Sequence, residues 1–126
     1  MYYLGLDVGS SSVKAGLIDA ASGKSLHSVH EPKNEMGIVS DKDEWAEQDP
    51  NDWWLHTCKA IQRVCHESNS DPKKIISIGI SYQMHGLVLV DNKGSVLRNS
   101  IIWCDSRAVD IGNKAFSEIG EEKCMK

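Results

Sequence analysis

Short apolar runs separated by turn residues dominate the first thirty positions of the chain. The run Tyr3–Val8 stops in Gly9-Ser10-Ser11-Ser12, and a second run, Val13–Asp19, follows at once. Two short apolar runs around a Gly/Ser turn are typical of a β-hairpin. Another turn signal at residues 21–24 precedes Ser25–His30, which can pair as a further strand. The pattern therefore predicts a meander of three antiparallel strands.

A helix is predicted after a charged, aperiodic segment that we expect to be a loop, residues 31–48. Asp49 suits the N-cap, Pro50 suits the first helical position, and Asp52 adds a carboxylate where the helix dipole favours one. The helix should run from Pro50 to about Ser68. Its apolar stripe is expected at helical spacing: Trp54, Cys58, Ile61 and Cys65, widened by Trp53, Ala60 and Val64.

The second half of the chain predicts two further strands, a short buried segment and a second helix. Isoleucines alternate over residues 74–81, as in a strand. The continuous apolar run Leu87–Val90 is typical of a strand buried on both faces. Ile101–Trp103 forms the short buried segment, and Ala108–Ile119 the helix, with Gly120 in its C-terminal position. This order predicts an α/β fold with a mixed sheet and flanking helices.

The length and net charge of the chain argue against several classes of protein. The chain of 126 residues suffices for one domain and not two. Its net charge of −4 argues against a nucleic-acid partner, which would need a basic surface. No apolar run approaches the roughly 20 residues that span a bilayer, and the N-terminus has no basic region or cleavage site of a secretory signal. We therefore expect a cytoplasmic protein without a membrane partner.

Four cysteines, at positions 58, 65, 104 and 124, are expected to be reduced. Seven residues of helix separate Cys58 from Cys65 by about 10.5 Å. A disulfide needs Cα atoms within about 7 Å, so these two cannot bridge. The chain contains no Cys-x-x-Cys pair, and its histidines do not fall at zinc spacings.

The first predicted hairpin carries the first candidate site, a carboxylate beside a polar turn. Asp7 ends the first strand, Gly9 permits close backbone approach, and Ser10–Ser12 offer hydroxyl and backbone N–H groups to phosphate oxygens. Lys14 can reach a phosphate, and Asp7 can hold Mg²⁺. An ordinary polar hairpin explains the same residues equally well. The chain has neither a Walker A loop nor a dinucleotide-binding glycine motif.

Two more polar clusters follow predicted strands, where open α/β sheets place ligands. The first is Gln83-Met84-His85-Gly86, in which His85 can donate or accept a proton at neutral pH, or simply be a histidine satisfied by the backbone. In the second, Trp103 can wall a pocket while Asp105 and Arg107 provide hydrogen bonds. Alternatively, Asp105 and Arg107 form a structural pair that caps the following helix, with Trp103 in the core.

Together these clusters resemble, in order and spacing, the amino-terminal part of the FGGY carbohydrate kinases. Four segments carry the resemblance: Tyr3–Lys14, Trp45–Pro50, Tyr82–Gly86 and Ile102–Arg107. Within Trp45–Pro50, helix capping explains Asp49 onward, whereas Trp45 and Glu47 have no structural reason in the sequence. Gln-Met-His-Gly is similar to the xylulokinase branch, where glycerol kinases carry Gln-Arg-Glu.

The resemblance implies a ribonuclease-H-like fold of the actin/hexokinase-like ATPase superfamily. FGGY kinases are several times longer than this chain and have two such domains with a cleft between them. Residues 1–126 would then be an incomplete N-terminal domain. The rest of that domain, the second domain and the catalytic aspartate would lie downstream.

The resemblance also assigns roles to residues. One group would bind the phosphates of ATP, with Asp7 also binding Mg²⁺: Asp7, Gly9, Ser10, Ser11, Ser12 and Lys14. Another would contact the sugar, namely Met84, His85 and Trp103, and a third would support it, namely Gln83, Asp105 and Arg107. The implied reaction is phosphorylation of D-xylulose to D-xylulose 5-phosphate by a full-length protein for which a homodimer is an option.

We expect residues 1–126 alone to be inactive in this reaction. Three alternatives stay open: a kinase for a related sugar or polyol, a standalone nucleotide-binding module of the same superfamily, and a small structural domain without a ligand.

Overall fold

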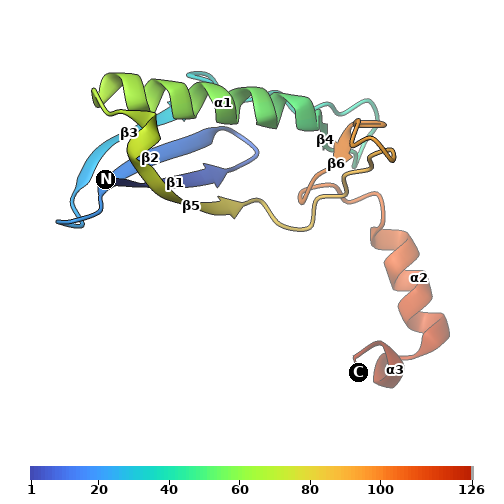
Figure 1. Cartoon of the computed structure of the whole chain (residues 1–126). Coiled ribbons are helices and arrows are strands. Elements are labelled where there is room, and N and C mark those ends of the chain that lie inside the picture. Colours follow the sequence, from blue (N-terminus) through green and yellow to red (C-terminus); the bar gives the residue numbers. More distant parts are fainter. Residues whose placement is uncertain (126) are drawn as a thin grey trace.

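The computed structural model describes residues 1–125, and its main element is a four-stranded mixed sheet (Figure 1). Strands β1 (Tyr2–Val8), β2 (Val13–Asp19) and β3 (Ser25–Glu31) form an antiparallel meander. Strand β5 (Ile75–Tyr82) pairs with β1 on its other side and runs parallel to it. The order β3-β2-β1-β5 confirms the predicted meander and the mixed sheet.

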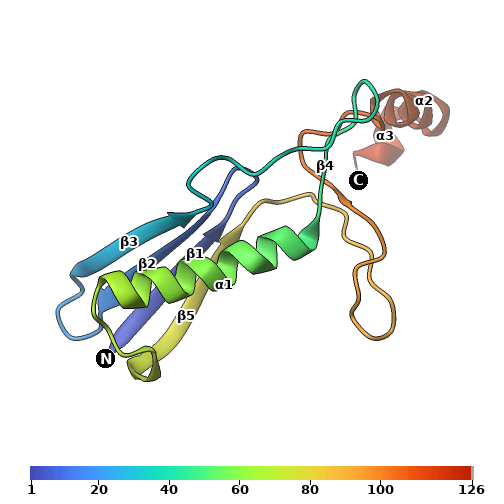
Figure 2. The same cartoon turned by 90° about the horizontal axis from the view of Figure 1, so that it is seen from above.

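Helix α1 (Pro50–Glu67) crosses one face of this sheet and connects the meander to β5 (Figure 2). Its N-cap is Asp49, whose Oδ1 accepts a hydrogen bond of 2.8 Å from the backbone N–H of Asn51. The predicted start of the helix is therefore confirmed. The predicted stripe is wrong at Trp54, whose side chain is 70% exposed. Because α1 packs mainly over β2 and β3, the buried positions lie on the face turned toward those strands.

The hydrophobic core lies between α1 and the sheet. Its buried side chains alternate along the strands and repeat at helical spacing along α1: Leu4, Leu6, Val13, Ala15, Leu17, Val29, Ala60, Val64 and Cys65. Burial raises the pKa of the Cys65 thiol, which favours the protonated, unreactive form. All four cysteines are free, as the sequence predicted.

Strand β5 confirms the predicted alternation, but its isoleucines are not covered. Ile78 pairs with Leu4 and Ile80 with Leu6, so these isoleucines lie on the same face of the sheet as the core. Helix α1 packs mainly on β2 and β3 and leaves most of β5 uncovered. Within residues 1–125, four side chains on this face are therefore 52–71% exposed, and we call them the β5 apolar strip: Ile76, Ile78, Ile80 and Tyr82.

The segment Leu87–Val90 does not form the doubly buried strand that the sequence predicted. Its side chains are 42–52% exposed, and it makes only isolated bridges, from Leu87 to Ile101 and from Val90 to Val96. The segment lies in a long loop beyond the end of β5, away from the main sheet (Figure 1). The prediction is wrong because an apolar run shows that burial is favourable, whereas residues 1–125 provide no layers to bury it.

Smaller elements complete the described part of the chain. Strands β4 (Glu47–Gln48) and β6 (Ser100–Ile101) pair within segments not predicted to form strands, and a 3₁₀ turn, Pro72–Lys74, precedes β5. Helix α2 (Val109–Ile119) confirms the predicted second helix and ends at Gly120, whose φ is 92°. The short helix α3 (Glu121–Cys124) follows, and both project away from the sheet (Figure 1). No helix within residues 1–125 combines the length and the apolar character needed to cross a membrane.

Candidate functional site

The turn between β1 and β2 contains backbone N–H groups that are not hydrogen-bonded within the described part of the chain. The backbone N–H of Gly9 donates to the carbonyl of Ser12 at 3.1 Å and closes the turn. A Cβ on Gly9 would lie 3.1 Å from that same carbonyl, so a larger residue would press against the turn. Within residues 1–125, the backbone N–H groups of Ser10, Ser11 and Ser12 have no hydrogen-bond acceptor. Consecutive unpaired N–H groups of this kind attract anions.

Asp7 and Lys14 lie side by side on the sheet face opposite α1. They are register partners of the hairpin, and Lys14 Nζ lies 3.2 Å from Asp7 Oδ2 in a solvent-exposed pair. Lys14 borders two shallow hollows: one of about 340 Å³ that includes Asp7, and one of about 350 Å³ that includes Ser11 and Ser12. A cation thus stands between a carboxylate and the serine turn.

Gln48 holds the serine turn in place. This side chain is only 3% exposed, and its Nε2 donates to the carbonyl oxygens of Ser10 at 2.7 Å and Gly37 at 3.1 Å. Its Oε1 accepts from Trp53 Nε1 at 3.1 Å. One buried amide therefore connects the serine turn to Gly37, in the loop that precedes α1, and to Trp53, in the first turn of α1. No role was predicted for Gln48 from the sequence, although it lies within Trp45–Pro50, one of the segments that carry the resemblance to the FGGY kinases.

The loop after β5 joins the hairpin at the carboxyl end of β1. The backbone N–H of Gln83 donates to the carbonyl of Val8 at 2.9 Å. His85 has a φ of 63°, a left-handed conformation that is uncommon outside glycine and often found at ligand sites. A cavity of about 220 Å³ opens here, lined by Val8, Trp53, Tyr82, Gln83, His85, Gly86 and Val88.

Of the three residues expected to contact a sugar, His85 lines this cavity and the other two lie outside it. Met84 and Trp103 are 63% and 58% exposed. Trp103 nevertheless reaches the hairpin, because its Nε1 lies 3.4 Å from the hydroxyl of Ser10. The structure thus brings Trp103 to the serine turn and Gln83 to the end of β1, while Met84 faces solvent.

Asp105 and Arg107 form a buried ion-pair network with Glu47. Arg107 donates through Nε and Nη2 to Asp105 at 2.7–2.9 Å, and through Nη2 to Glu47 Oε1 at 2.7 Å. Arg98 is a second ion-pair partner of Glu47. Asp105 also accepts the backbone N–H of Ala46 at 2.7 Å. We call Glu47, Asp105 and Arg107 the clasp, since it fastens residues 46–47 to residues 105–107.

The clasp shifts the pKa values of Asp105 and Arg107. The hydrogen bonds from Arg107 hold the pKa of Asp105 at about 2, below its usual 3.8, and the carboxylate in turn raises the pKa of Arg107. The clasp does not cap α2, whose N-cap is Ala108 without a side-chain hydrogen bond. It supplies the structural reason for Glu47 that the sequence did not offer.

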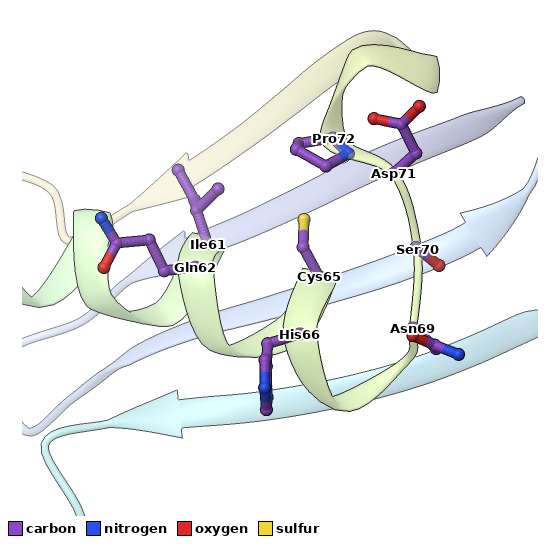
Figure 3. Close-up of a pocket in the computed structure, with 8 residues that line it drawn as sticks. All are labelled: Ile61, Gln62, Cys65, His66, Asn69, Ser70, Asp71 and Pro72. Carbon is purple, nitrogen blue, oxygen red and sulfur yellow. The ribbon is translucent and has the colours of Figure 1, made fainter.

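A further hollow, of about 580 Å³, lies at the carboxyl-terminal end of α1 (Figure 3). It is formed where the end of α1 meets the turn before β5, and its wall includes Ile61, Cys65 and Pro72. It contains none of the predicted site residues. The ligand-binding candidates therefore concentrate at the opposite end of α1, where β1 and β5 both end.

The residues at the hairpin fit the phosphates of ATP and a magnesium ion. Mg²⁺ in nucleotide sites is usually held by one or two carboxylates together with phosphate oxygens and water. Asp7 supplies one exposed carboxylate, and the unpaired serine N–H groups and Lys14 supply phosphate ligands. Within residues 1–125, no group of three acidic, histidine or cysteine side chains could hold a metal without such phosphate oxygens.

Comparison of the sequence with known proteins identifies the family of this chain. The family model described as "FGGY family of carbohydrate kinases, N-terminal domain" matches residues 2–126. Curated relatives include a xylulose kinase of Bacillus subtilis, 39% identical over 106 residues, which are 84% of this chain and 20% of that protein. A xylulose kinase of Klebsiella pneumoniae is 37% identical over 86% of this chain and 21% of its own. The chain thus spans about a fifth of the length of the curated relatives it matches.

Solved structures agree with the family model. A ligand-bound xylulose kinase from Lactobacillus acidophilus superposes with a TM-score of 0.81 at 31% identity, over 93% of this chain and 22% of that one. A gluconate kinase from the same organism gives the same values. A xylulose kinase from Rhodospirillum rubrum, at 24% identity and a TM-score of 0.82 over 98% of this chain and 24% of its own, shares the fold. This fold is that of the actin/hexokinase-like ATPases. The chain belongs to the FGGY family of carbohydrate kinases, which are ATP-dependent phosphotransferases.

Proposed function

We propose that residues 1–126 are the amino-terminal part of a kinase that transfers the γ-phosphoryl group of ATP to the 5-hydroxyl of D-xylulose. The observation that carries this proposal is the position of the serine turn. The turn offers unpaired N–H groups beside Asp7 and Lys14, and it also touches Trp103 and adjoins the Gln83–Gly86 loop. A phosphate-binding element and a candidate sugar-binding loop therefore lie at one end of the sheet.

The proposed roles of the hairpin follow from the charge that moves during phosphoryl transfer. Such reactions depend on in-line positioning and on neutralising the phosphates, more than on covalent chemistry by the protein. The N–H groups of Ser10–Ser12 would bind phosphate oxygens, and Lys14 would add a positive charge. Asp7 would hold Mg²⁺, which neutralises phosphate charge when it is bound. Gln48 keeps the turn open by occupying the carbonyl of Ser10 rather than an N–H group.

The sugar would be held by Met84, His85 and Trp103, with Gln83, Asp105 and Arg107 in support. The clasp fixes the backbone two residues from Trp103, so it sets where the indole ring can lie. The base that accepts the proton of the sugar hydroxyl would be an aspartate downstream of residue 126. We also place the full-length protein in the cytoplasm, with no nucleic-acid partner.

A second candidate function is phosphorylation of a related sugar acid or polyol. The equal similarity to a xylulose kinase and to a gluconate kinase from one organism favours keeping it. D-xylulose is preferred because the relatives at 36–39% identity are xylulose kinases. A standalone nucleotide-binding module is a third reading, and it predicts ATP binding without phosphorylation of any sugar.

The test is steady-state kinetics of the full-length protein, with ATP and each sugar varied separately over D-xylulose, gluconate and glycerol. Asp7→Asn should lower kcat at least a hundredfold with every substrate, because it removes the metal ligand common to all. His85→Asn should instead raise KM for the sugar and leave KM for ATP unchanged. Asparagine is chosen because it tolerates the positive φ of this position.

Asp43→Asn, in an exposed loop, is the matched control and should leave both constants unchanged. Rapid turnover of gluconate with none of D-xylulose would replace the first candidate by the second. ATP binding without turnover of any sugar would favour the standalone module.

A further inference from the structure

The side-chain amide of Gln83 is buried and unpaired. Both Nε2 and Oε1 are inaccessible to solvent, and neither has a hydrogen-bond partner within residues 1–125. Buried amide groups almost always have partners, because leaving one unpaired is costly. A ligand that accepts from Nε2 and donates to Oε1 would remove this cost.

The backbone that carries this amide is held in position by the sheet. Gln83 immediately follows β5, and its backbone N–H is bonded to the carbonyl of Val8 at the end of β1. Two parallel strands therefore fix the backbone from which the side chain extends. A backbone fixed before the ligand arrives loses little conformational entropy on binding, which favours a role in recognition.

The cavity that Gln83 helps to line selects a chemical class of ligand. Its apolar wall comes from Val8, Trp53 and Val88, and the Trp53 ring is itself held by its hydrogen bond to Gln48. Its polar groups are those of Tyr82, Gln83 and His85. None of the residues that line it is acidic, lysine or arginine, so the cavity suits a neutral group. A small molecule with an apolar C–H face and hydroxyl groups along one edge matches this lining.

We propose that Gln83 is a sugar-binding residue whose amide binds two neighbouring hydroxyl groups of the neutral part of the sugar in this cavity. One hydroxyl donates to Oε1, and the other accepts from Nε2. The assignment rests on the proposed sugar kinase function and refines it, since Gln83 becomes a direct sugar ligand rather than a supporting residue. It also separates the site in two, with the anionic phosphates at Lys14 and the neutral polyol at Gln83.

The competing explanation is structural: residues downstream of 126 could pair with the amide in the full-length protein. In that case Gln83 would contribute to stability and would not distinguish one hydroxyl pattern from another. The two explanations differ in how sugar analogues behave, because only a direct ligand senses the loss of one particular hydroxyl.

The experiment uses the full-length protein and measures binding by isothermal titration calorimetry without nucleotide. The probes are D-xylulose and its 1-deoxy, 3-deoxy and 4-deoxy analogues. Gln83→Met keeps the length of the side chain and removes both hydrogen-bonding groups, and Gln83→Glu keeps the shape and removes the donor. Gln62→Met is the matched control, on an exposed position of α1 outside the cavity.

We expect Gln83→Met to weaken binding of D-xylulose about tenfold, as loss of one or two hydrogen bonds implies. At least one deoxy analogue should bind wild-type protein about tenfold more weakly than D-xylulose, and Gln83→Met should abolish that difference. Gln83→Glu should retain the penalty for the hydroxyl that donates to Oε1 and lose the other. Gln62→Met should match wild type.

Two results would overturn the assignment. In one, Gln83→Met lowers the melting temperature yet keeps the wild-type ranking of the deoxy analogues, which is the structural explanation. In the other, the wild-type protein binds none of these polyols. A protein that binds D-xylulose through Gln83 but does not phosphorylate it would support the assignment and refute the proposed kinase reaction, so the two failures are distinguishable.

Discussion

The guanidinium carbon of Arg107 lies 3.7 Å from the centroid of the Trp45 ring. The same guanidinium is hydrogen-bonded to Asp105 and Glu47, so its edge meets two carboxylates while its face covers an indole. Lys42 Nζ lies 4.7 Å from the centroid of the same ring. Trp45, which had no structural explanation in the sequence, is therefore the apolar platform of the clasp.

Arg107→Met should lower the free energy of unfolding by about 3 kcal/mol, because two largely buried carboxylates would lose their shared partner. The side chains of Asp105 and Glu47 are only 3% and 11% exposed. Arg107→Lys should recover less than half of this loss, since an ammonium group cannot bind two carboxylates and stack on a ring at once. Urea denaturation of the full-length protein, followed by tryptophan fluorescence, measures both.

Lys114→Met is the control for this charge change, because the Lys114–Glu118 pair is 76% and 66% exposed. It should alter stability by less than about 0.5 kcal/mol. An Arg107→Met protein as stable as this control would show that the clasp contributes nothing to stability.

The pH dependence of stability should carry the signature of Asp105. Its pKa is about 2 in the folded protein and near 3.8 when unfolded, so the folded state favours the charged carboxylate. The resulting stabilisation, on the order of 2 kcal/mol, is fully present well above pH 3.8 and is lost as pH falls toward 2. About half of it should be gone at pH 3.

Asp105→Asn isolates this effect from other acid-sensitive groups. The variant should be less stable than wild type at pH 7, and the gap should narrow steadily between pH 5 and pH 3. Thermal melts of the two proteins across this range are the measurement. A gap that stays constant with pH would mean that the pKa of Asp105 is not depressed by folding.

Residues 1–126 alone should show no sugar kinase activity. The chain spans about a fifth of the relatives it matches. The base that we propose, and the second domain that the family resemblance implies, would lie outside it. A positioned base typically contributes 10²–10⁴-fold to the rate, and positioning by a closing domain contributes further. ADP release by the purified chain, with ATP and D-xylulose, should not exceed that of a Lys14→Ala variant. Sugar-dependent release above this control would contradict the prediction.

The β5 apolar strip should make residues 1–126 associate when they are produced alone. Exposed apolar patches beyond a few hundred Å² are rare on soluble monomers. Replacing Ile78 and Ile80 together by threonine keeps β-branched residues in the strand and should reduce both light scattering and binding of a hydrophobic dye. Ile18→Thr, at a 38% exposed position of β2, is the control and should change neither. A wild-type chain that is monodisperse and binds no dye would show that the strip needs no cover.

Local signals allowed much of this fold to be predicted, and long-range contacts account for what was missed. The hairpin and the start of α1 depend on turn residues and on an N-cap that lie next to each other in the sequence. The burial of Leu87–Val90 depends on layers that a one-dimensional pattern does not contain. Glu47 and Arg107 are 60 positions apart, and they are brought together by the pairing of β4 with β6 and by the backbone hydrogen bonds beside it.

Some features of the candidate site were likewise predictable from the sequence, and others depend on long-range contacts. A row of serines after Asp7 is visible in the sequence, and so is the polar loop at Gln83–Gly86. The buried bonds from Gln48 to the serine turn were not visible, because they require α1 to be docked on the sheet. The unpaired state of the Gln83 amide could be found only by examining every neighbour of the side chain in space.

All nine buried residues of the core lie between Leu4 and Cys65. A nascent chain would therefore have synthesised all nine of these residues before β5 leaves the ribosome. We expect the meander and α1 to collapse together first, because their contacts span shorter sequence separations than those between β1 and β5. The parallel pairing of β5 with β1 should follow as the slower step. The edge of β1 would stay open until then, so the interval between these two steps is when the growing chain most needs protection by a chaperone.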